Sequence, residues 1–199
     1  MRYGPEKKTK PCCLIACRVF KPAIESLELE KRYPDITVTY LPSRLHLAPR
    51  ALRNRLAKQI ASARRTSERV VCLYGECFPE IDRFCKQRGV EKVPGHYCYE
   101  MLLGSERFNK LLDETVGTYF AEQDLILNFQ EYCVKPLELD DEDMKKCYFG
   151  QYRRLLYVRQ PSDPDLSPEA GHVARLLGLS LEVRDVDYSY LREDLARLL

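Results

Sequence analysis

Short apolar runs alternate with longer amphipathic stretches along this chain of 199 residues. The runs at residues 12–20, 36–41, 69–74, 91–94, 154–158 and 180–186 have the length and composition of buried strands, and residues 117–121 fit a strand or a loop. Between them, apolar residues recur at helical spacing. This pattern predicts helices that begin at Pro22, Pro49 and Pro79, and helices over residues 99–112, 125–133, 168–177 and 190–199.

Repeated alternation of strands and helices indicates a mainly parallel sheet with helices on both faces. We therefore expect an α/β fold: a single three-layer, Rossmann-like domain over residues 12–199, with one sheet of five to six strands. Residues 1–11 are charged and hydrophilic, and we expect them to form a flexible N-terminal segment. In sheets of this kind, ligands bind at the carboxyl ends of the strands, so the residues at that edge are the first candidates for function.

Composition narrows the classes of partner. Lysine and arginine total 32 against 30 aspartate and glutamate residues, so the net charge is +2. This balance favours neither a nucleic acid nor an anionic membrane as partner, and the basic helix over residues 50–65 is better explained as a solvated face. Because the apolar runs are strand-sized and the first residues are hydrophilic, we expect a cytoplasmic protein.

Nine cysteines are the unusual feature of the composition. An odd number without an export signal, in a chain long enough to form its own core, indicates reduced thiols or metal ligands rather than a disulfide framework. The sequence contains no CxxC motif. A metal site would therefore have to be assembled from distant segments.

Cys17, Cys77 and Cys98 each lie near the carboxyl end of a predicted strand and shortly before a predicted helix. Neighbouring strands are about 4.8 Å apart, so three such strand ends could bring three thiolates to one metal centre. His96, two residues before Cys98, and His46, in the loop after the second strand, reach the same edge of the sheet. These five residues are the predicted metal ligands.

Most other cysteines are interpreted as packing residues, because a cysteine thiol behaves as a small hydrophobic group. Cys12, Cys13, Cys72 and Cys85 are assigned to the core, and packing is also favoured for Cys133 and Cys147. Gly75 and Glu76, in the loop after the third strand, are candidates for binding a cofactor, although no glycine-rich nucleotide motif is present.

Several sequence blocks resemble an uncharacterised family catalogued as domain of unknown function 1638. The blocks are LIACRVF at 14–20, LHLAP at 45–49, LYGEC at 73–77, PGHYC at 94–98, LLGSERF at 102–108 and GTYF at 117–120. The resemblance implies that Ser105 and Tyr119 also belong to the site, and it covers the three cysteines chosen above. The chain departs from the family pattern at Gly95, Tyr97, Glu76 and Phe78.

The resemblance also implies a setting, because members of the family are associated with corrinoid-dependent methyl transfer. We therefore expect a metal-binding accessory protein or enzyme of that chemistry, with corrinoid methyltransferase proteins and a small-molecule ligand as partners. The metal centre could be a zinc ion or a [4Fe-4S] cluster, since both take thiolate ligands. The alternatives are a metal-free enzyme with Cys98 or Cys77 as nucleophile and His96 or His46 as base, and a non-catalytic assembly partner.

Overall fold

A computed structural model describes residues 11–199, so the predicted flexible segment falls, except for Pro11, outside the described residues. The chain divides into two compact units. Unit 1 comprises the residues up to Val93 together with Leu195–Leu199, and unit 2 comprises Pro94–Asp194. Each unit contains its own parallel sheet.

Unit 1 contains a four-stranded sheet in the order β2-β1-β3-β4. Its strands are β1 (Cys12–Cys17), β2 (Ile36–Leu41), β3 (Arg69–Leu73) and β4 (Glu91–Lys92). All neighbouring pairs are parallel, with Cys17 opposite Leu41 and Ala16 opposite Leu73. Every residue of β1 is buried because this strand lies inside the sheet and both of its faces are covered.

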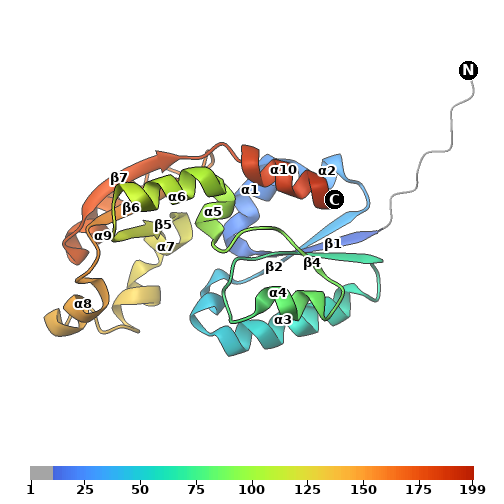
Figure 1. The fold of residues 1–199 in the computed structure, drawn as a ribbon, viewed down its shortest axis with the longest axis horizontal. Coiled ribbons are helices and arrows are strands. Elements are labelled where there is room, and N and C mark those ends of the chain that lie inside the picture. The colour runs from blue at the N-terminus through green and yellow to red at the C-terminus, as the bar shows by residue number, and fades with distance from the viewer. Residues whose placement is uncertain (1–10) are drawn as a thin grey trace, which may run out of the picture. The chain divides into compact units, whose positions relative to one another are not determined.

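Helices cover both faces of this sheet, as Figure 1 shows, with α1 and α2 on one side and α3 and α4 on the other. Their bounds are α1 (Lys21–Ser26), α2 (Leu29–Arg32), α3 (Pro49–Ala63) and α4 (Ile81–Lys86), with short 3-10 helices η1 (Arg18–Phe20) and η2 (Ser43–Leu47). The chain therefore leaves β1 toward one face and β3 toward the other. This divergence places a topological switch point between the carboxyl ends of β1 and β3, where α/β sheets bind their ligands.

Unit 2 contains a three-stranded parallel sheet in the order β5-β6-β7. Its strands are β5 (Thr118–Ala121), β6 (Arg154–Arg159) and β7 (Ser180–Asp185). Its helices are α5 (Cys98–Leu103), α6 (Ser105–Glu114), α7 (Gln123–Leu127), the π-helix η3 (Gln130–Val134), α8 (Glu142–Phe149) and α9 (Ser167–Leu177), and α10 (Ser189–Leu198) continues into unit 1.

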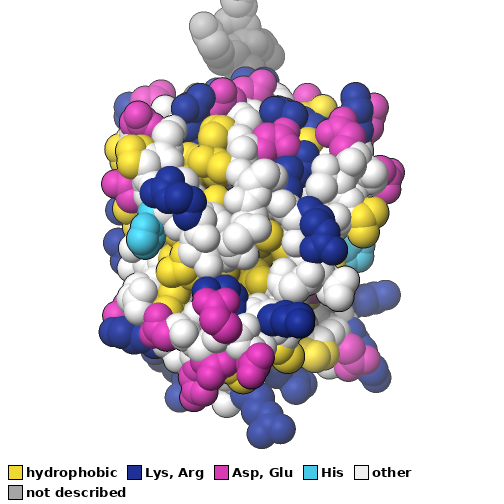
Figure 2. Space-filling model, turned by 90° about the vertical axis from the view of Figure 1, so that its left-hand side faces the viewer, with side chains coloured by type: hydrophobic (Ala, Val, Ile, Leu, Met, Phe, Trp, Pro, Cys, Tyr) yellow, Lys and Arg dark blue, Asp and Glu magenta, His cyan; other side chains and the backbone are white. Residues whose placement is uncertain are grey.

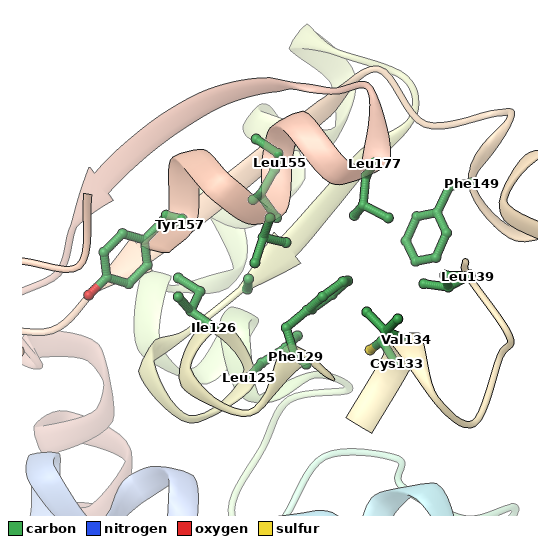
Figure 3. Packing of buried hydrophobic residues seen from close by; sticks show 14 of the residues in the cluster. Leu125, Ile126, Phe129, Cys133, Val134, Leu139, Phe149, Leu155, Tyr157 and Leu177 are labelled. Atoms are coloured by element: carbon green, nitrogen blue, oxygen red, sulfur yellow. The ribbon is translucent and has the colours of Figure 1, made fainter. Parts of the chain in front are cut away.

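One apolar cluster holds the sheet of unit 2 to the helices that follow its strands (Figure 3). Leu155 and Tyr157 of β6 point into it, together with side chains from α7, η3, α8 and α9. Phe120 of β5 instead contacts Phe108 of α6, with ring centroids 4.9 Å apart. Alternate residues of one strand thus pack against different helices, as the two-residue repeat of a strand requires.

The α/β class and the parallel strands are confirmed, and the strand order with helices on both faces makes unit 1 Rossmann-like. The prediction of one sheet with five to six strands is wrong, because the described residues form two sheets. An apolar run identifies a strand but does not show which neighbour it pairs with, and β4 pairs with β3 over only two residues. The prediction of a single domain over residues 12–199 stays a prediction.

Several boundaries also differ from expectation. The first strand ends at Cys17 rather than residue 20, because the chain turns through η1 before the proline of α1. The predicted helix over 125–133 is divided at Asn128, whose side chain donates to the carbonyl oxygen of Asp124 at 2.8 Å. The helix predicted over 99–112 is interrupted at Gly104 as expected, where the backbone φ is +82°.

The described helices include none that has both the length and the apolar character needed to cross a membrane. On the face that Figure 2 shows, acidic and basic side chains are interspersed. This distribution agrees with the near balance of charge in the sequence.

Candidate functional site

The switch point of unit 1 lies between two of the predicted ligands. Cys17 is the last residue of β1, and Cys77 lies in the loop that follows the neighbouring strand β3. The amide of Cys77 donates to the carbonyl oxygen of Gly75 at 2.8 Å, so the loop turns tightly here. Cys17 is buried, at 8% exposure, and Cys77 is half-buried.

The Tyr74 hydroxyl lies near both thiols. Tyr74 directly follows β3 and is 1% exposed, and its hydroxyl has no hydrogen-bond partner within the described part of the chain. Burial raises the pKa of Tyr74, and Cys17, Cys72 and Cys77 raise it further when they are ionised, because the charge of a thiolate disfavours the phenolate. Cys17 and Cys77, from neighbouring strand ends, are therefore close to one buried polar atom.

A buried lysine provides the positive charge of this region. The Lys92 side chain is 8% exposed, and its Nζ lies 3.2 Å from Asp82 Oδ1. Nζ also donates to the carbonyl oxygens of Val93, at 3.2 Å, and Tyr74, at 3.4 Å. Burial raises the pKa of the Cys77 thiol, and the Lys92 ammonium offsets part of this effect. Cys77 is therefore a protonated thiol at neutral pH.

Cys72 of β3 and Cys85 of α4 form a hydrogen-bonded thiol pair. The hydrogen bond from Cys72, assisted by Lys92, lowers the pKa of Cys85, whereas the same hydrogen bond and complete burial raise the pKa of Cys72. Both residues are at most 1% exposed. Their assignment to the core is confirmed, as it is for Cys12, Cys13 and Cys133. Cys147, which was also expected to pack, is exposed on α8.

The other predicted thiol ligand belongs to unit 2. Cys98 is the first residue of α5 and is half-buried, and the His96 side chain is exposed in the preceding loop. Glu100 holds this loop: it accepts hydrogen bonds from the His96 amide at 2.8 Å and from the Ser105 hydroxyl at 2.7 Å. Burial would raise the pKa of Glu100, but these bonds and the Tyr97 amide outweigh it and hold the pKa below its usual value.

The remaining predicted site residues are divided between the two units. His46 is exposed in η2, which follows β2 in unit 1, and Glu76 is exposed in the loop beside buried Gly75. Tyr119 lies in unit 2, where its ring packs against Phe149 and its hydroxyl lies 3.7 Å from the sulfur of Cys133. The structure therefore places Tyr119 at the apolar core of its unit.

Within unit 1, the structure brings Cys17 and Cys77 to the same sheet edge. Across residues 11–199, no group of three or more histidine, cysteine, aspartate or glutamate side chains is arranged to hold a metal ion. Sequence reasoning missed Tyr74 and Lys92 as neighbours of the thiols. The signal available for Lys92 was its position in the predicted fourth strand, because lysine is rare at buried positions.

Comparison with known proteins gives one match. Residues 40–195 match the model of a family described as a protein of unknown function, DUF1638. No curated protein matches the chain, and neither does any solved structure.

Proposed function

The chain belongs to the DUF1638 family, and we propose that it binds a thiophilic metal centre through Cys17 and Cys77 at the carboxyl edge of the four-stranded sheet. The observation that supports this proposal most is the position of the two thiols. Cys17 ends β1 and Cys77 lies in the loop after the neighbouring parallel strand β3, so they flank the switch point, and both interact electrostatically with the same buried tyrosine hydroxyl. This is the edge where sheets of this kind hold their ligands.

The chemistry of the donors fits such a centre. Thiolates select zinc and iron–sulfur clusters over hard cations. The Lys92 ammonium would compensate part of the negative charge of two thiolates, and the Tyr74 hydroxyl would gain a hydrogen-bond partner, which it lacks among the described residues. A bound zinc ion with an open position would supply Lewis-acid chemistry.

The raised pKa of Cys77 argues against this residue as a metal-free nucleophile. A cysteine nucleophile is activated by a lowered pKa or an adjacent base, but burial raises the pKa of Cys77. Cys85, whose pKa is lowered, is 1% exposed and so is poorly accessible to a substrate. Metal binding does not require a preformed thiolate, because coordination itself removes the proton.

Zinc fits two thiolates better than a cluster does, since two thiolates with nitrogen or oxygen ligands are a common zinc set, whereas a [4Fe-4S] cluster takes cysteines at most of its irons. Cys98, His96 and His46 stay predicted ligands from the sequence. The same holds for the cytoplasmic location, the small-molecule ligand and the link to corrinoid methyltransferase proteins.

Metal analysis of anaerobically purified protein tests the proposal. We expect about one zinc ion, or a brown iron–sulfur chromophore, per chain in the wild type. Cys17→Ser and Cys77→Ser should each lose most of the metal, because a serine oxygen is a poorer ligand for these metals. Cys98→Ser and His96→Ala show whether unit 2 contributes.

Cys147→Ser is the matched control, because this cysteine is exposed on α8 and belongs to no predicted site. Its metal content should equal that of the wild type. A wild-type protein that binds neither zinc nor a cluster, or a Cys77→Ser variant with full metal content, would contradict the proposal.

A further inference from the structure

The four-stranded sheet of unit 1 ends on one side at β2, and this edge lacks the features that usually protect a sheet edge. β2 is an outer strand of the sheet, and its six residues, Ile36–Leu41, include no charged residue, glycine or proline. Its register with β1 runs without a bulge. Thr37 is exposed and residues 38–40 are half-buried. An open strand of this kind is a template for pairing with another chain.

The other three edges of the two described sheets are protected. β4 is only two residues long, and β5 has four residues, of which three are buried. β7 carries the charged residues Glu182, Arg184 and Asp185, and the Asp185 carbonyl oxygen accepts a hydrogen bond from Arg107 at 2.9 Å. Short length, burial and charge are the usual means of preventing edge-to-edge pairing. Within residues 11–199, β2 is therefore the exception.

Alternate residues of β2 direct their backbone groups away from the sheet. The Cys12 amide donates to the Asp35 carbonyl oxygen at 3.0 Å, so Asp35 and every second residue after it face β1. The N–H and C=O groups of Val38 and Tyr40, and the C=O group of Ile36, therefore point outward. Among the described residues, no hydrogen bond engages these outward groups.

The sequence of β2 is nearly symmetrical about its centre. In an antiparallel pair of two such strands centred on Val38, each Val38 lies opposite the other. Thr37 then lies opposite Thr39 of the second copy, and Ile36 lies opposite Tyr40. Threonine pairs and pairs of aromatic with β-branched residues are favourable cross-strand neighbours, and this register brings no like charges together.

Hydrogen bonding selects the same register. Centred on Val38, the two Val38 residues exchange N–H···O bonds, and each Tyr40 amide reaches the Ile36 carbonyl oxygen of the second copy. A register centred on Tyr40 would place Val38 opposite Pro42, which has no amide to donate. A register centred on Ile36 would place Val38 opposite Pro34, and the Ile36 amide already donates within its own chain at 3.0 Å. The register centred on Val38 therefore forms the most hydrogen bonds.

We propose that two copies of this chain associate through antiparallel pairing of their β2 strands, with the two-fold axis at Val38. The contact is isologous, because the same strand is used by both copies, and it joins the two four-stranded sheets into one. The paired segment is short, so we expect a dissociation constant on the order of micromolar. Cys17 and Cys77 lie outside β2, so the inference does not depend on the proposed metal centre.

Sedimentation equilibrium of the full-length protein, over about 1–200 µM, tests this inference. We expect a concentration-dependent equilibrium between monomer and dimer in the wild type. Val38→Pro should weaken the dimer about tenfold or more, because both copies lose the central amide donor. The ladder with β1 keeps its hydrogen bonds in this variant, since proline is tolerated where the amide of an edge strand faces solvent.

Val183→Pro is the matched control on the edge strand β7. The amides of Ser180 and Val186 donate to carbonyl oxygens of Arg153, at 3.1 Å, and Arg159, at 3.0 Å, so the amide of Val183 also points away from its own sheet. This variant should associate as the wild type does.

A pair of charge variants tests the register and also serves if Val38→Pro fails to fold. Thr37→Lys combined with Thr39→Lys places lysines opposite each other and should abolish the dimer. Thr37→Lys combined with Thr39→Glu places opposite charges together and should retain it. Circular dichroism confirms that each variant is folded. A wild type that is monomeric at every concentration, or folded charge variants that associate equally, would overturn the proposal.

Discussion

At the scale of single residues, the Tyr74 hydroxyl is the most informative group of the thiol site. It is buried without a hydrogen-bond partner among the described residues, and an unsatisfied buried hydroxyl costs about 1–3 kcal/mol. Replacing Tyr74 with phenylalanine should therefore raise the free energy of unfolding of the metal-free protein by about 1 kcal/mol, measured by urea denaturation.

Tyr157→Phe provides the comparison, because the Tyr157 hydroxyl donates to Asp163 at 2.7 Å. That variant should lose about 1.5–3 kcal/mol of unfolding free energy, since it removes a hydrogen bond to a charged group. Equal losses in the two variants would show that the Tyr74 hydroxyl has a partner in the metal-free protein.

Lys92 offsets part of the effect of burial on the pKa of Cys77. Its ammonium group favours the thiolate, so Lys92→Met should raise the pKa of Cys77 further. The measurement is the rate of Cys77 alkylation as a function of pH, followed by mass spectrometry of the peptide, and its midpoint should move to higher pH. Lys86→Met, an exposed lysine on α4, should leave the midpoint in place. An unchanged midpoint in Lys92→Met would contradict the assigned role.

The sequence was sufficient to place Cys17 and Cys77 at one edge of the sheet, because both follow apolar runs and the carboxyl ends of parallel strands share one edge. It could not show Tyr74 as their neighbour, since the direction of a side chain at a strand end depends on the exact end of the strand. The prediction that Cys147 packs in the core is wrong, because this residue is exposed on α8. A cysteine does not indicate burial when most of the helix around it is polar.

At the scale of elements, Glu122 joins β5 to α7. Its carboxylate caps the helix by accepting the amides of Asp124 at 2.7 Å and Leu125 at 3.0 Å. Burial nevertheless raises its pKa from 4.5 to about 7. Between these pH values the folded state binds a proton that the unfolded state releases. The stability that this protonation contributes is fully present below pH 4.5 and is lost as the pH rises through about 7.

Glu122→Gln should remove this dependence. In the wild type the free energy of unfolding should fall by at most about 1.4 kcal/mol per pH unit between these limits, and in the variant this contribution should disappear. Urea denaturation at pH 5 and pH 8 provides the measurement. Asp141→Asn, at the exposed cap of α8, is the control and should keep the wild-type slope. A slope that persists in Glu122→Gln would assign the dependence to other groups.

Helical periodicity predicted the longest elements well. In α3, Leu52, Leu56 and Ile60 are buried on one face as their spacing requires, and the helix begins at Pro49. The shorter segments were less predictable, because a few hydrogen bonds decide them. The Asn128 amide that divides the helix expected over 125–133 is one such case.

At the scale of the whole molecule, the largest difference from expectation is the division of the strands into two sheets. Strand–helix alternation is the same in one sheet as in two, so periodicity alone does not distinguish them. The deciding features are local: β4 is only two residues long, and β5 pairs with β6 alone among the described strands. Two parallel sheets give two carboxyl edges, and the proposed metal centre lies at the edge of the four-stranded sheet.

The central claim is that Cys17 and Cys77 are ligands of the same metal centre. X-ray absorption at the zinc edge of the anaerobically loaded protein measures it directly, by counting sulfur atoms at about 2.3 Å from the metal. We predict two or three sulfur atoms in the wild type and one fewer in Cys77→Ser, with no change in Cys147→Ser. A zinc ion surrounded only by nitrogen and oxygen atoms, or an equal sulfur count in wild type and Cys77→Ser, would contradict the claim.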